Sequence, residues 1–224
     1  MHRTRIKICG ICRPQDALAA ASAGADAIGM VFHPASPRCI GIDDARQILA
    51  ALPPFVAAIG LFVDADAQAI THITEQLRLC AIQLHGSESP QLVAQLKPTP
   101  VIKALRLGDD AEQTLAQWRA AITDMHLSNL RAILLETPAE VPGGSGVPND
   151  WNVLHRLQQS GSFNGLPALI AAGGLTAQSV GEVVRLLRPF AVDVSTGVES
   201  ARREKSPQKI LDFIRAVCAA DAGG

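Results

Sequence analysis

The chain has 224 residues, of which 48% are hydrophobic and 18% charged, and its formal net charge is −1. A mean hydropathy of +0.19 excludes a disordered chain, and the lack of a basic excess argues against nucleic acid or an anionic membrane as partner. No apolar run approaches the ~18 residues of a membrane span, and five scattered Cys do not form a secreted disulfide framework. A strand-like pattern begins almost at once and leaves no room for a signal peptide, so we expect a cytoplasmic protein.

Short apolar, β-branched runs alternate along the chain with longer amphipathic segments. Each short run is bounded by Gly, Pro or polar residues, which is typical of strands. Pro14, Ser87 with Glu88 and Pro90, and Ser206 with Pro207 are typical of helix starts. In chain order we predict strand 5–9, helix 14–23, strand 27–32, helix 43–51, strand 57–62, helix 65–76, strand 81–84, helix 87–96, strand 101–104, helix 111–124, strand 132–135, helix 150–159, strand 168–171, helix 176–187, strand 192–194 and helix 206–217.

Eight successive strand–helix pairs predict a parallel sheet, because each return to a parallel strand needs a crossover helix. An open doubly wound sheet is the alternative. Eight units in this length favour a single-domain (β/α)8 TIM barrel that spans residues 1–224. The Pro/Gly-rich stretch 137–148 is expected to be an active-site loop and not a linker.

The alternation of side chains along the strands indicates which polar groups point into the barrel. Lys7 and Cys9 share one face of the first strand, while Asp193 and Glu136 take the same orientation on later strands. Barrel active sites lie at the C-terminal ends of the strands, where Cys9 and Glu136 are placed. Gln83 and His85 also share a face, although a packed core histidine is the slightly favoured interpretation of His85.

Eight short segments, each weak by itself, follow one another in an order that a known family shares. In this set the chain resembles the phosphoribosylanthranilate isomerases of tryptophan biosynthesis. The resemblance implies a TIM barrel that converts N-(5-phosphoribosyl)anthranilate to 1-(2-carboxyphenylamino)-1-deoxyribulose 5-phosphate by an Amadori rearrangement, without a cofactor or metal. The segments are KICGI from Lys7, GADAIG from Gly24, SPR from Ser36, GLFV from Gly60, QLHG from Gln83, GGSG from Gly143 with Asp150-Trp151, AGGL from Ala172 and VDVSTGVE from Val192.

The resemblance implies that Cys9 is the general base and Glu136 the general acid. A lone buried cysteine is usually an inert small hydrophobe, but a positive charge from Lys7 could lower the pKa of Cys9, a hypothesis we state beside a structural pairing of Lys7 with Asp193. The family has Asp where this chain has Glu136, so the acid is one methylene longer. A misplacement of about 1 Å can reduce a rate ~10²-fold. The alternative for Glu136 is a carboxylate that caps a loop.

The resemblance further implies the residues that hold the substrate. Arg38 would bind the anthranilate carboxylate through its planar guanidinium, and Asp193 would lie near the sugar hydroxyls. Gln83 and His85 are candidate substrate contacts. Phosphate would be bound by backbone N–H groups of the loops after strands six, seven and eight, with Gly144, Ser145, Gly146, Gly173, Gly174, Thr196 and Gly197.

Several alternatives stay open at this point. Cys9 and Cys12 form a CxxC pair, but a zinc site normally needs a second ligand pair, and we expect no metal; a disulfide between them, which would silence the base, is a hypothesis. A related phosphate-binding barrel with another reaction, such as indole-glycerol-phosphate synthesis or the histidine-pathway isomerisation, is one alternative function. A non-catalytic phosphate-ligand sensor is another. We expect a small-molecule substrate and a monomer or weak homodimer.

Overall fold

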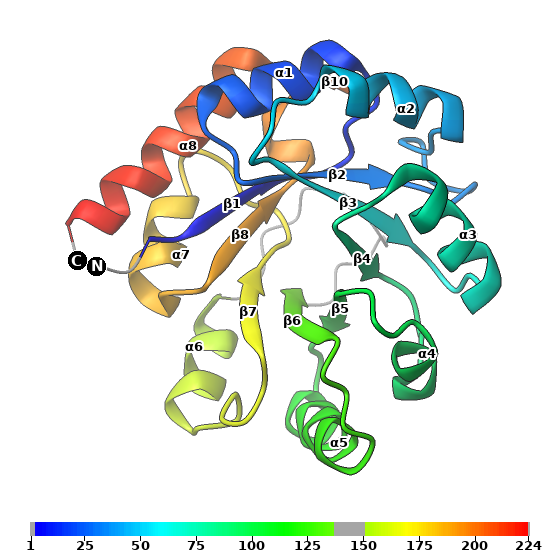
Figure 1. The fold of residues 1–224 in the computed structure, drawn as a ribbon. Coiled ribbons are helices and arrows are strands. Elements are labelled where there is room, and N and C mark those ends of the chain that lie inside the picture. Colours follow the sequence, from blue (N-terminus) through cyan, green and yellow to red (C-terminus); the bar gives the residue numbers. More distant parts are fainter. Residues whose placement is uncertain (1–2, 137–150, 224) are drawn as a thin grey trace.

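The computed structural model describes residues 3–136 and 151–223, and within them eight parallel strands close into a barrel with helices around it (Figure 1). Strands that are neighbours in sequence pair with each other, and β1 (Arg5–Ile8) pairs with β8 (Ala191–Val194) to close the ring. In the register of this closing pair, Lys7 lies opposite Asp193. The predicted TIM barrel is therefore confirmed, and the open sheet is excluded.

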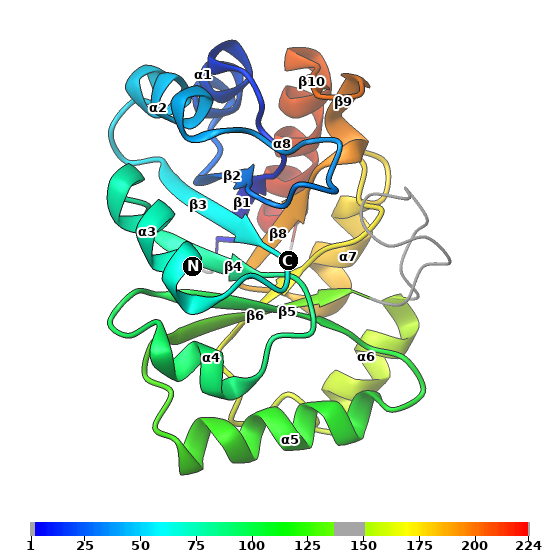
Figure 2. The same ribbon diagram turned by 90° about the vertical axis from the view of Figure 1, so that its right-hand side faces the viewer.

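The remaining elements alternate along the chain as predicted, and Figure 2 shows the helices outside the strands. The strands are β2 (Ala27–Val31), β3 (Ala57–Phe62), β4 (Ala81–Leu84), β5 (Val101–Arg106), β6 (Leu130–Glu136) and β7 (Ala168–Ala171). The helices are α1 (Pro14–Ala23), α2 (Ile42–Ala51), α3 (Ala67–Leu77), α4 (Pro90–Gln95), α5 (Ala111–Asp124), α6 (Trp151–Gln159), α7 (Val180–Leu187) and α8 (Pro207–Ala222).

Two separate cores confirm the predicted alternation of side chains. A large apolar layer lies between the strands and the helices. The outward-facing residues of β1 and β8, among them Ile8 and Val194, belong to it. Inside the barrel a second cluster, which includes Ile102 and Leu134, fills the middle. A small third cluster of Cys9, Val31 and Leu61 lies above it at the strand ends. The barrel interior is thus apolar in its middle, while polar side chains gather toward the C-terminal ends of the strands.

Three helices differ from the prediction by three residues or more at one end, each for a physical reason. Helix α4 begins at Pro90 with Ser89 as its N-cap, because the carboxylate of Glu88 accepts hydrogen bonds from the backbone of Asp64 and Gly86 and pairs with Lys103. Helix α7 begins at Val180, since residues 176–179 form a turn closed by their own side chains. Helix α8 runs on to Ala222, where Asp221 accepts two hydrogen bonds from Thr4 and joins the two ends of the chain.

A short hairpin after β8 is absent from the predicted elements. It follows a 3-10 turn, Thr196–Val198, and consists of the antiparallel strands β9 (Glu199–Ala201) and β10 (Glu204–Lys205). Both Glu199 and Lys205 are buried. Buried charges are stable only when they are paired, so this hairpin is fixed by ion pairs and not by an apolar face.

Candidate active site

The C-terminal ends of the strands enclose a cavity of about 430 Å³. Its polar lining comes from six different strands or the residues that follow them, which is the arrangement of barrel active sites. Of the predicted site residues, the cavity brings together Cys9, Arg38, Gln83, His85, Glu136 and Asp193.

Beside Cys9 lies a buried ion pair. Lys7 Nζ is 2.8 Å from Asp193 Oδ1, and both side chains are less than a tenth exposed. Burial opposes the charge on Lys7, but the Asp193 carboxylate and the Cys9 thiol outweigh it and raise its pKa. Burial also raises the pKa of Cys9, and the attraction of Lys7 offsets only part of this rise. Lys7 therefore favours the thiolate and lowers the pKa of Cys9, as hypothesised, but by less than burial raises it.

Gly29 on β2 gives Lys7 and Cys9 the space they occupy. A Cβ at this position would lie 2.8 Å from Cys9 Sγ and 2.9 Å from Lys7 Nζ. These distances are shorter than van der Waals contact, so any side chain here would displace the thiol and the ammonium together.

Across the cavity, Glu136 at the end of β6 contacts His85, which follows β4. His85 Nε2 is 3.3 Å from Glu136 Oε2, and the two side chains are 14% and 20% exposed. On the far side of the imidazole, Gln83 Nε2 is 2.9 Å from His85 Nδ1. Burial favours the protonated acid, but the hydrogen bond and charge of His85, followed by the charges of Arg106 and Lys7, lower the pKa of Glu136 overall. His85 is thus a cavity residue and not a packed core residue.

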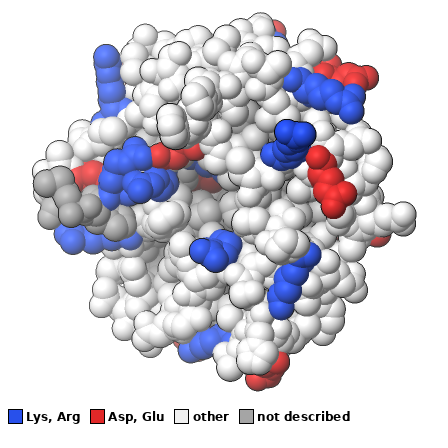
Figure 3. All heavy atoms as spheres, viewed as in Figure 1, with Lys and Arg blue, Asp and Glu red and all other residues white. Residues whose placement is uncertain are grey.

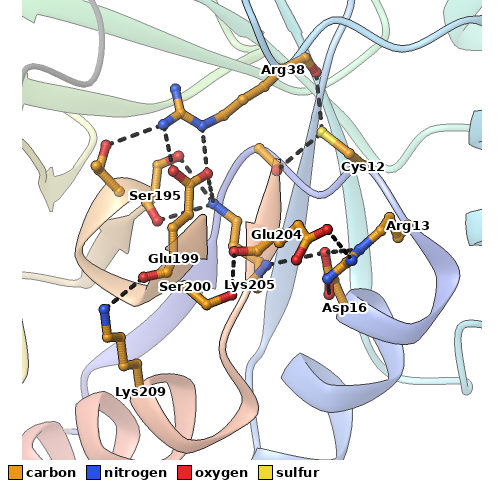
Figure 4. Close-up of polar contacts among 12 residues, drawn as sticks. Cys12, Arg13, Asp16, Arg38, Ser195, Glu199, Ser200, Glu204, Lys205 and Lys209 are labelled. Carbon is orange, nitrogen blue, oxygen red and sulfur yellow. Dashed lines mark hydrogen bonds and ion pairs between the residues drawn. The ribbon is translucent and has the colours of Figure 1, made fainter. Parts of the chain in front are cut away.

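Arg38 lies in the cavity wall and is held by Glu199 of the β9 hairpin (Figure 4). Its Nε and Nη2 each donate to one Glu199 carboxylate oxygen at 2.7 Å. Lys205 Nζ donates to Glu199 Oε1 at 3.0 Å and to Ser195. Burial by itself would raise the pKa of Glu199. The hydrogen bonds from Arg38 and the charge of Lys205 outweigh burial, so the pKa lies below its ordinary value. A carboxylate ligand would therefore approach Arg38 at Nη1, since Nε and Nη2 already donate to Glu199 and Nη2 also to Thr196.

Arg106 is not among the predicted site residues, yet it lines the cavity. It ends β5 directly opposite Glu136 in the β5–β6 register. Arg106 shares a strand face with Ile102 and Ala104, which fill the barrel interior. This alternation is the sequence signal that would have placed the guanidinium at the mouth of the barrel.

The candidate phosphate-binding residues in the loops after β7 and β8 are not among the residues that line this cavity. Gly173 and Gly174 have φ values of 92° and 65°, which L side chains rarely adopt. A Cβ at Gly197 would lie 2.0 Å from the carbonyl oxygen of Leu175, so loops seven and eight touch at this glycine. Thr196 Oγ1 accepts a hydrogen bond from Arg38 Nη2 at 3.4 Å, which connects the loops to the cavity. Gly144, Ser145 and Gly146 lie outside the described residues.

Cys12 belongs to a different environment from Cys9. Both are free thiols, but Cys12 packs in the outer apolar layer, and its Sγ donates to the carbonyls of Gly10 and Arg38. Within residues 3–136 and 151–223, no group of three or more His, Cys, Asp or Glu is placed to hold a metal ion.

The surface seen in Figure 3 carries small, separate groups of Lys and Arg interspersed with Asp and Glu, and most of this face is uncharged. No helix in the described part of the chain combines the length and apolar character that crossing a bilayer requires.

Comparisons with known proteins agree in one family. A family model described as N-(5'phosphoribosyl)anthranilate (PRA) isomerase matches residues 6–216. An N-(5'-phosphoribosyl)anthranilate isomerase of Pseudomonas putida (strain GB-1) is 45% identical over 220 residues, which cover 97% of this chain and 98% of the relative.

Solved structures of the same family superpose on nearly all of this chain. Phosphoribosyl anthranilate isomerase from Thermotoga maritima has a TM-score of 0.83 at 36% identity and covers 96% of this chain and 99% of its own. A phosphoribosyl anthranilate isomerase in complex with reduced 1-(o-carboxyphenylamino)-1-deoxyribulose 5-phosphate has a TM-score of 0.80 at 34% identity, with the same coverage. Another structure, at 31% identity and TM-score 0.80 with the same coverage, is described as mutually generated monomers of the dimeric phosphoribosylanthranilate isomerase from Thermotoga maritima.

Proposed function

The chain belongs to the N-(5'-phosphoribosyl)anthranilate isomerase family, and from this membership we propose how its own side chains carry out the isomerisation. It converts N-(5'-phosphoribosyl)anthranilate to 1-(2-carboxyphenylamino)-1-deoxyribulose 5-phosphate in tryptophan biosynthesis. One observation carries the proposed mechanism: Cys9 and Glu136, from the non-adjacent strand ends of β1 and β6, face the same cavity.

Glu136 acts first, as the general acid. Its protonated carboxyl gives a proton to the ring oxygen of the ribose, and the bond between C1' and that oxygen breaks. The nitrogen lone pair forms the C1'=N double bond of a Schiff base within the substrate, which is why the reaction needs no cofactor. General acid catalysis of this kind contributes about 10²–10⁴-fold.

Cys9 then acts as the general base. Its thiolate removes the proton from C2', the electron pair forms a C1'=C2' double bond, and the nitrogen regains its lone pair. The resulting enol releases its hydroxyl proton to solvent and takes at C1' the proton that the Cys9 thiol now holds. This leaves a ketone at C2' and restores the thiolate. The attraction of Lys7 supports the thiolate during this step, because the pKa of Cys9 is otherwise raised by burial.

Three further groups hold the substrate in this proposal. Arg38 binds the anthranilate carboxylate, Asp193 contacts the sugar hydroxyls while it pairs with Lys7, and the glycine loops after β7 and β8 bind the phosphate. A guanidinium that is already fixed by Glu199 loses little side-chain entropy on binding. This supports a binding role for Arg38.

The test is a steady-state assay of the purified protein with N-(5'-phosphoribosyl)anthranilate. We expect turnover by the wild type, and Arg38→Ala should raise KM at least ~10-fold with a smaller effect on kcat, because a carboxylate contact made in both ground and transition states is lost. Binding of the product without any turnover would favour the sensor alternative. Turnover of a histidine-pathway substrate instead would favour the related isomerase.

We also propose that residues 1–224 form a single domain that works in the cytoplasm as a monomer or weak homodimer. The closed barrel, which leaves no strand edge unpaired within the described residues, supports one folding unit. The dimeric Thermotoga maritima relative supports a homodimer. Light scattering over a range of protein concentrations would separate the two oligomeric states, and cell fractionation would test the location.

A further inference from the structure

The proposed acid, Glu136, has the imidazole of His85 as a polar neighbour. His85 reaches across the end of β5 to Glu136, with Nε2 3.3 Å from Oε2. Gln83 Nε2 donates to His85 Nδ1 at 2.9 Å, so the imidazole in this arrangement carries its proton on Nε2 and directs it at the carboxylate. Gln83, His85 and Glu136 thus form a continuous chain of hydrogen bonds that ends in the cavity.

This chain leaves one buried group unsatisfied. Gln83 Oε1 is buried and has no hydrogen-bond partner among the described residues. A buried acceptor without a donor is costly. A half-turn of the Gln83 amide would bring Oε1 to Nδ1, where it could accept a hydrogen bond, provided that Nδ1 also carries a proton. The orphaned oxygen therefore fits a second state in which His85 is an imidazolium.

A second observation concerns the acid itself. A general acid must hold a proton, yet the surroundings of Glu136 lower its pKa and favour the carboxylate in the empty site. The reaction therefore needs a proton source for Glu136. Its carboxylate contacts His85, whose Nε2 lies 3.3 Å from Glu136 Oε2.

Other charged groups near the pair are less suited to supply the proton. Lys7 is bound to Asp193, and Lys103 is bound to Glu88. A guanidinium such as that of Arg106 does not give up its proton in proteins. The charged or titratable groups that line the same cavity or act on Glu136 are Lys7, Cys9, His33, Arg38, Arg106 and Asp193; Asp64, Glu88 and Lys103 line the neighbouring pocket.

We propose that His85 protonates the general acid. As an imidazolium whose Nδ1–H donates to Gln83 Oε1, His85 passes its Nε2 proton to Glu136, and Glu136 then protonates the ring oxygen. The inference rests on the proposed role of Glu136 as the acid. His85 takes a proton from solvent, the Nε2–H bond breaks as the Oε2–H bond forms, and the carboxyl protonates the ring oxygen as the C1'–O bond breaks. The proton that the C2' hydroxyl later releases returns to solvent, so the cycle is balanced.

The test compares variants that separate proton transfer from positioning. His85→Gln places an amide near Nε2, which can still donate a hydrogen bond to Glu136 but cannot take up and pass on a proton. We expect kcat to fall ~10²-fold with KM changed less than about threefold. Gln83→Met, which removes the amide oxygen in similar volume, should lower kcat ~10-fold by the same mechanism. His72→Gln, on the surface of α3, is the matched control and should leave both constants unchanged.

A double variant decides whether His85 acts through Glu136. In a Glu136→Gln background, His85→Gln should cause no further loss of kcat, because the relay is already cut. The proposal is overturned if His85→Gln keeps the wild-type kcat, if its loss lies in KM alone, or if the two losses multiply. A wild type that does not isomerise the substrate refutes the proposed function itself, whereas an active wild type with an equally active His85→Gln refutes only the relay.

Discussion

At the end of β1, the thiol of Cys9 lies between a buried ammonium and a glycine. Lys7 favours its thiolate, and Gly29 leaves room for both groups. The base therefore depends on two residues that never touch the reacting carbon. Each of them gives a prediction at the scale of a single side chain.

Gly29→Ala should inactivate the enzyme while the barrel stays folded. The new Cβ would displace Cys9 Sγ and Lys7 Nζ, so kcat should fall at least ~10²-fold, as expected for a misplaced catalytic group. Overpacking should reduce the free energy of unfolding by about 1–3 kcal/mol. Gly181→Ala is the control, since a Cβ there meets only ordinary contacts at 3.5 Å or more. Kinetics and urea unfolding of both variants test this, and an active Gly29→Ala enzyme would refute the geometry.

The dependence of kcat/KM on pH should follow the ionisation of the Cys9 thiol. Because burial raises the pKa of Cys9, the thiolate fraction and hence kcat/KM should increase as the pH rises above neutrality. Lys7→Met removes the cation that lowers this pKa, so the rising limb should move to higher pH. The rate of alkylation of Cys9 by iodoacetamide, measured over the same pH range, should move in parallel. An unchanged limb in Lys7→Met would show that Lys7 acts only as the partner of Asp193.

Period-two alternation predicted that Cys9 and Glu136 face one interior, because both end strands that close the same barrel. The contacts of Arg38 could not be predicted in this way. Its partner Glu199 is 161 residues away and becomes a neighbour only when a hairpin folds against the loop after β2. Arg106 was accessible to the alternation argument but carried no motif, so it was missed.

At the scale of elements, the same residue types have different uses in different loops. Glu88 and Ser87 precede a helix and suggest an N-terminal cap and acid. In the folded chain Glu88 is instead a buried partner of Lys103, and it joins the loops after β3 and β4 to β5. A helix-start acid and a buried counter-ion look alike in sequence, because the distinction depends on a lysine on another strand.

Asp66 gives a prediction for one helix. It is the N-cap of α3, and its side chain accepts a hydrogen bond from the Ala69 backbone N–H at 2.8 Å. Asp66→Ala should therefore reduce the free energy of unfolding by about 1 kcal/mol and leave kcat unchanged. Ser89→Ala is the matched control, because Ser89 caps α4 without a side-chain hydrogen bond and should cost less. Equal losses in urea unfolding would contradict the capping argument.

At the scale of the whole molecule, buried ion pairs join segments that lie far apart in the chain. Figure 4 shows one such set, in which Arg38, Glu199 and Lys205 connect the loop after β2 to the β9 hairpin. Beside it, Asp16 accepts a hydrogen bond from the Lys205 backbone N–H, and the partly exposed Arg13 pairs with Glu204. Lys7 and Asp193 do the same inside the barrel, and Glu88 with Lys103 joins the loop after β4 to the outward face of β5. Removing one partner of a buried pair typically costs about 3–5 kcal/mol, so these pairs help to hold the two ends of the barrel sequence together.

Acid should unfold the protein through these carboxylates. Burial alone would raise the pKa of Glu88, but Lys103 and backbone N–H donors outweigh burial and bring the pKa below its ordinary value. The pKa of Glu199 is likewise lowered. A depressed folded pKa contributes stability that is present above the unfolded value of about 4.3 and is lost as the pH falls through the folded pKa. The free energy of unfolding should therefore decrease below about pH 5. Glu88→Gln should weaken the dependence of this free energy on pH, whereas Glu112→Gln, at an exposed position, should leave it unchanged. If urea unfolding gave both variants the same change of stability with pH, Glu88 would not be a source of the acid sensitivity.

The central claim is that this barrel isomerises its substrate with Cys9 as base and Glu136 as acid. The most direct measurement is the loss of substrate fluorescence under saturating N-(5'-phosphoribosyl)anthranilate for the wild type, Cys9→Ala and Glu136→Gln. The wild type should turn over, and each variant should lose at least ~10²-fold in kcat while it retains the wild-type circular dichroism spectrum. A folded Cys9→Ala variant that turns over at the wild-type rate would contradict the claim.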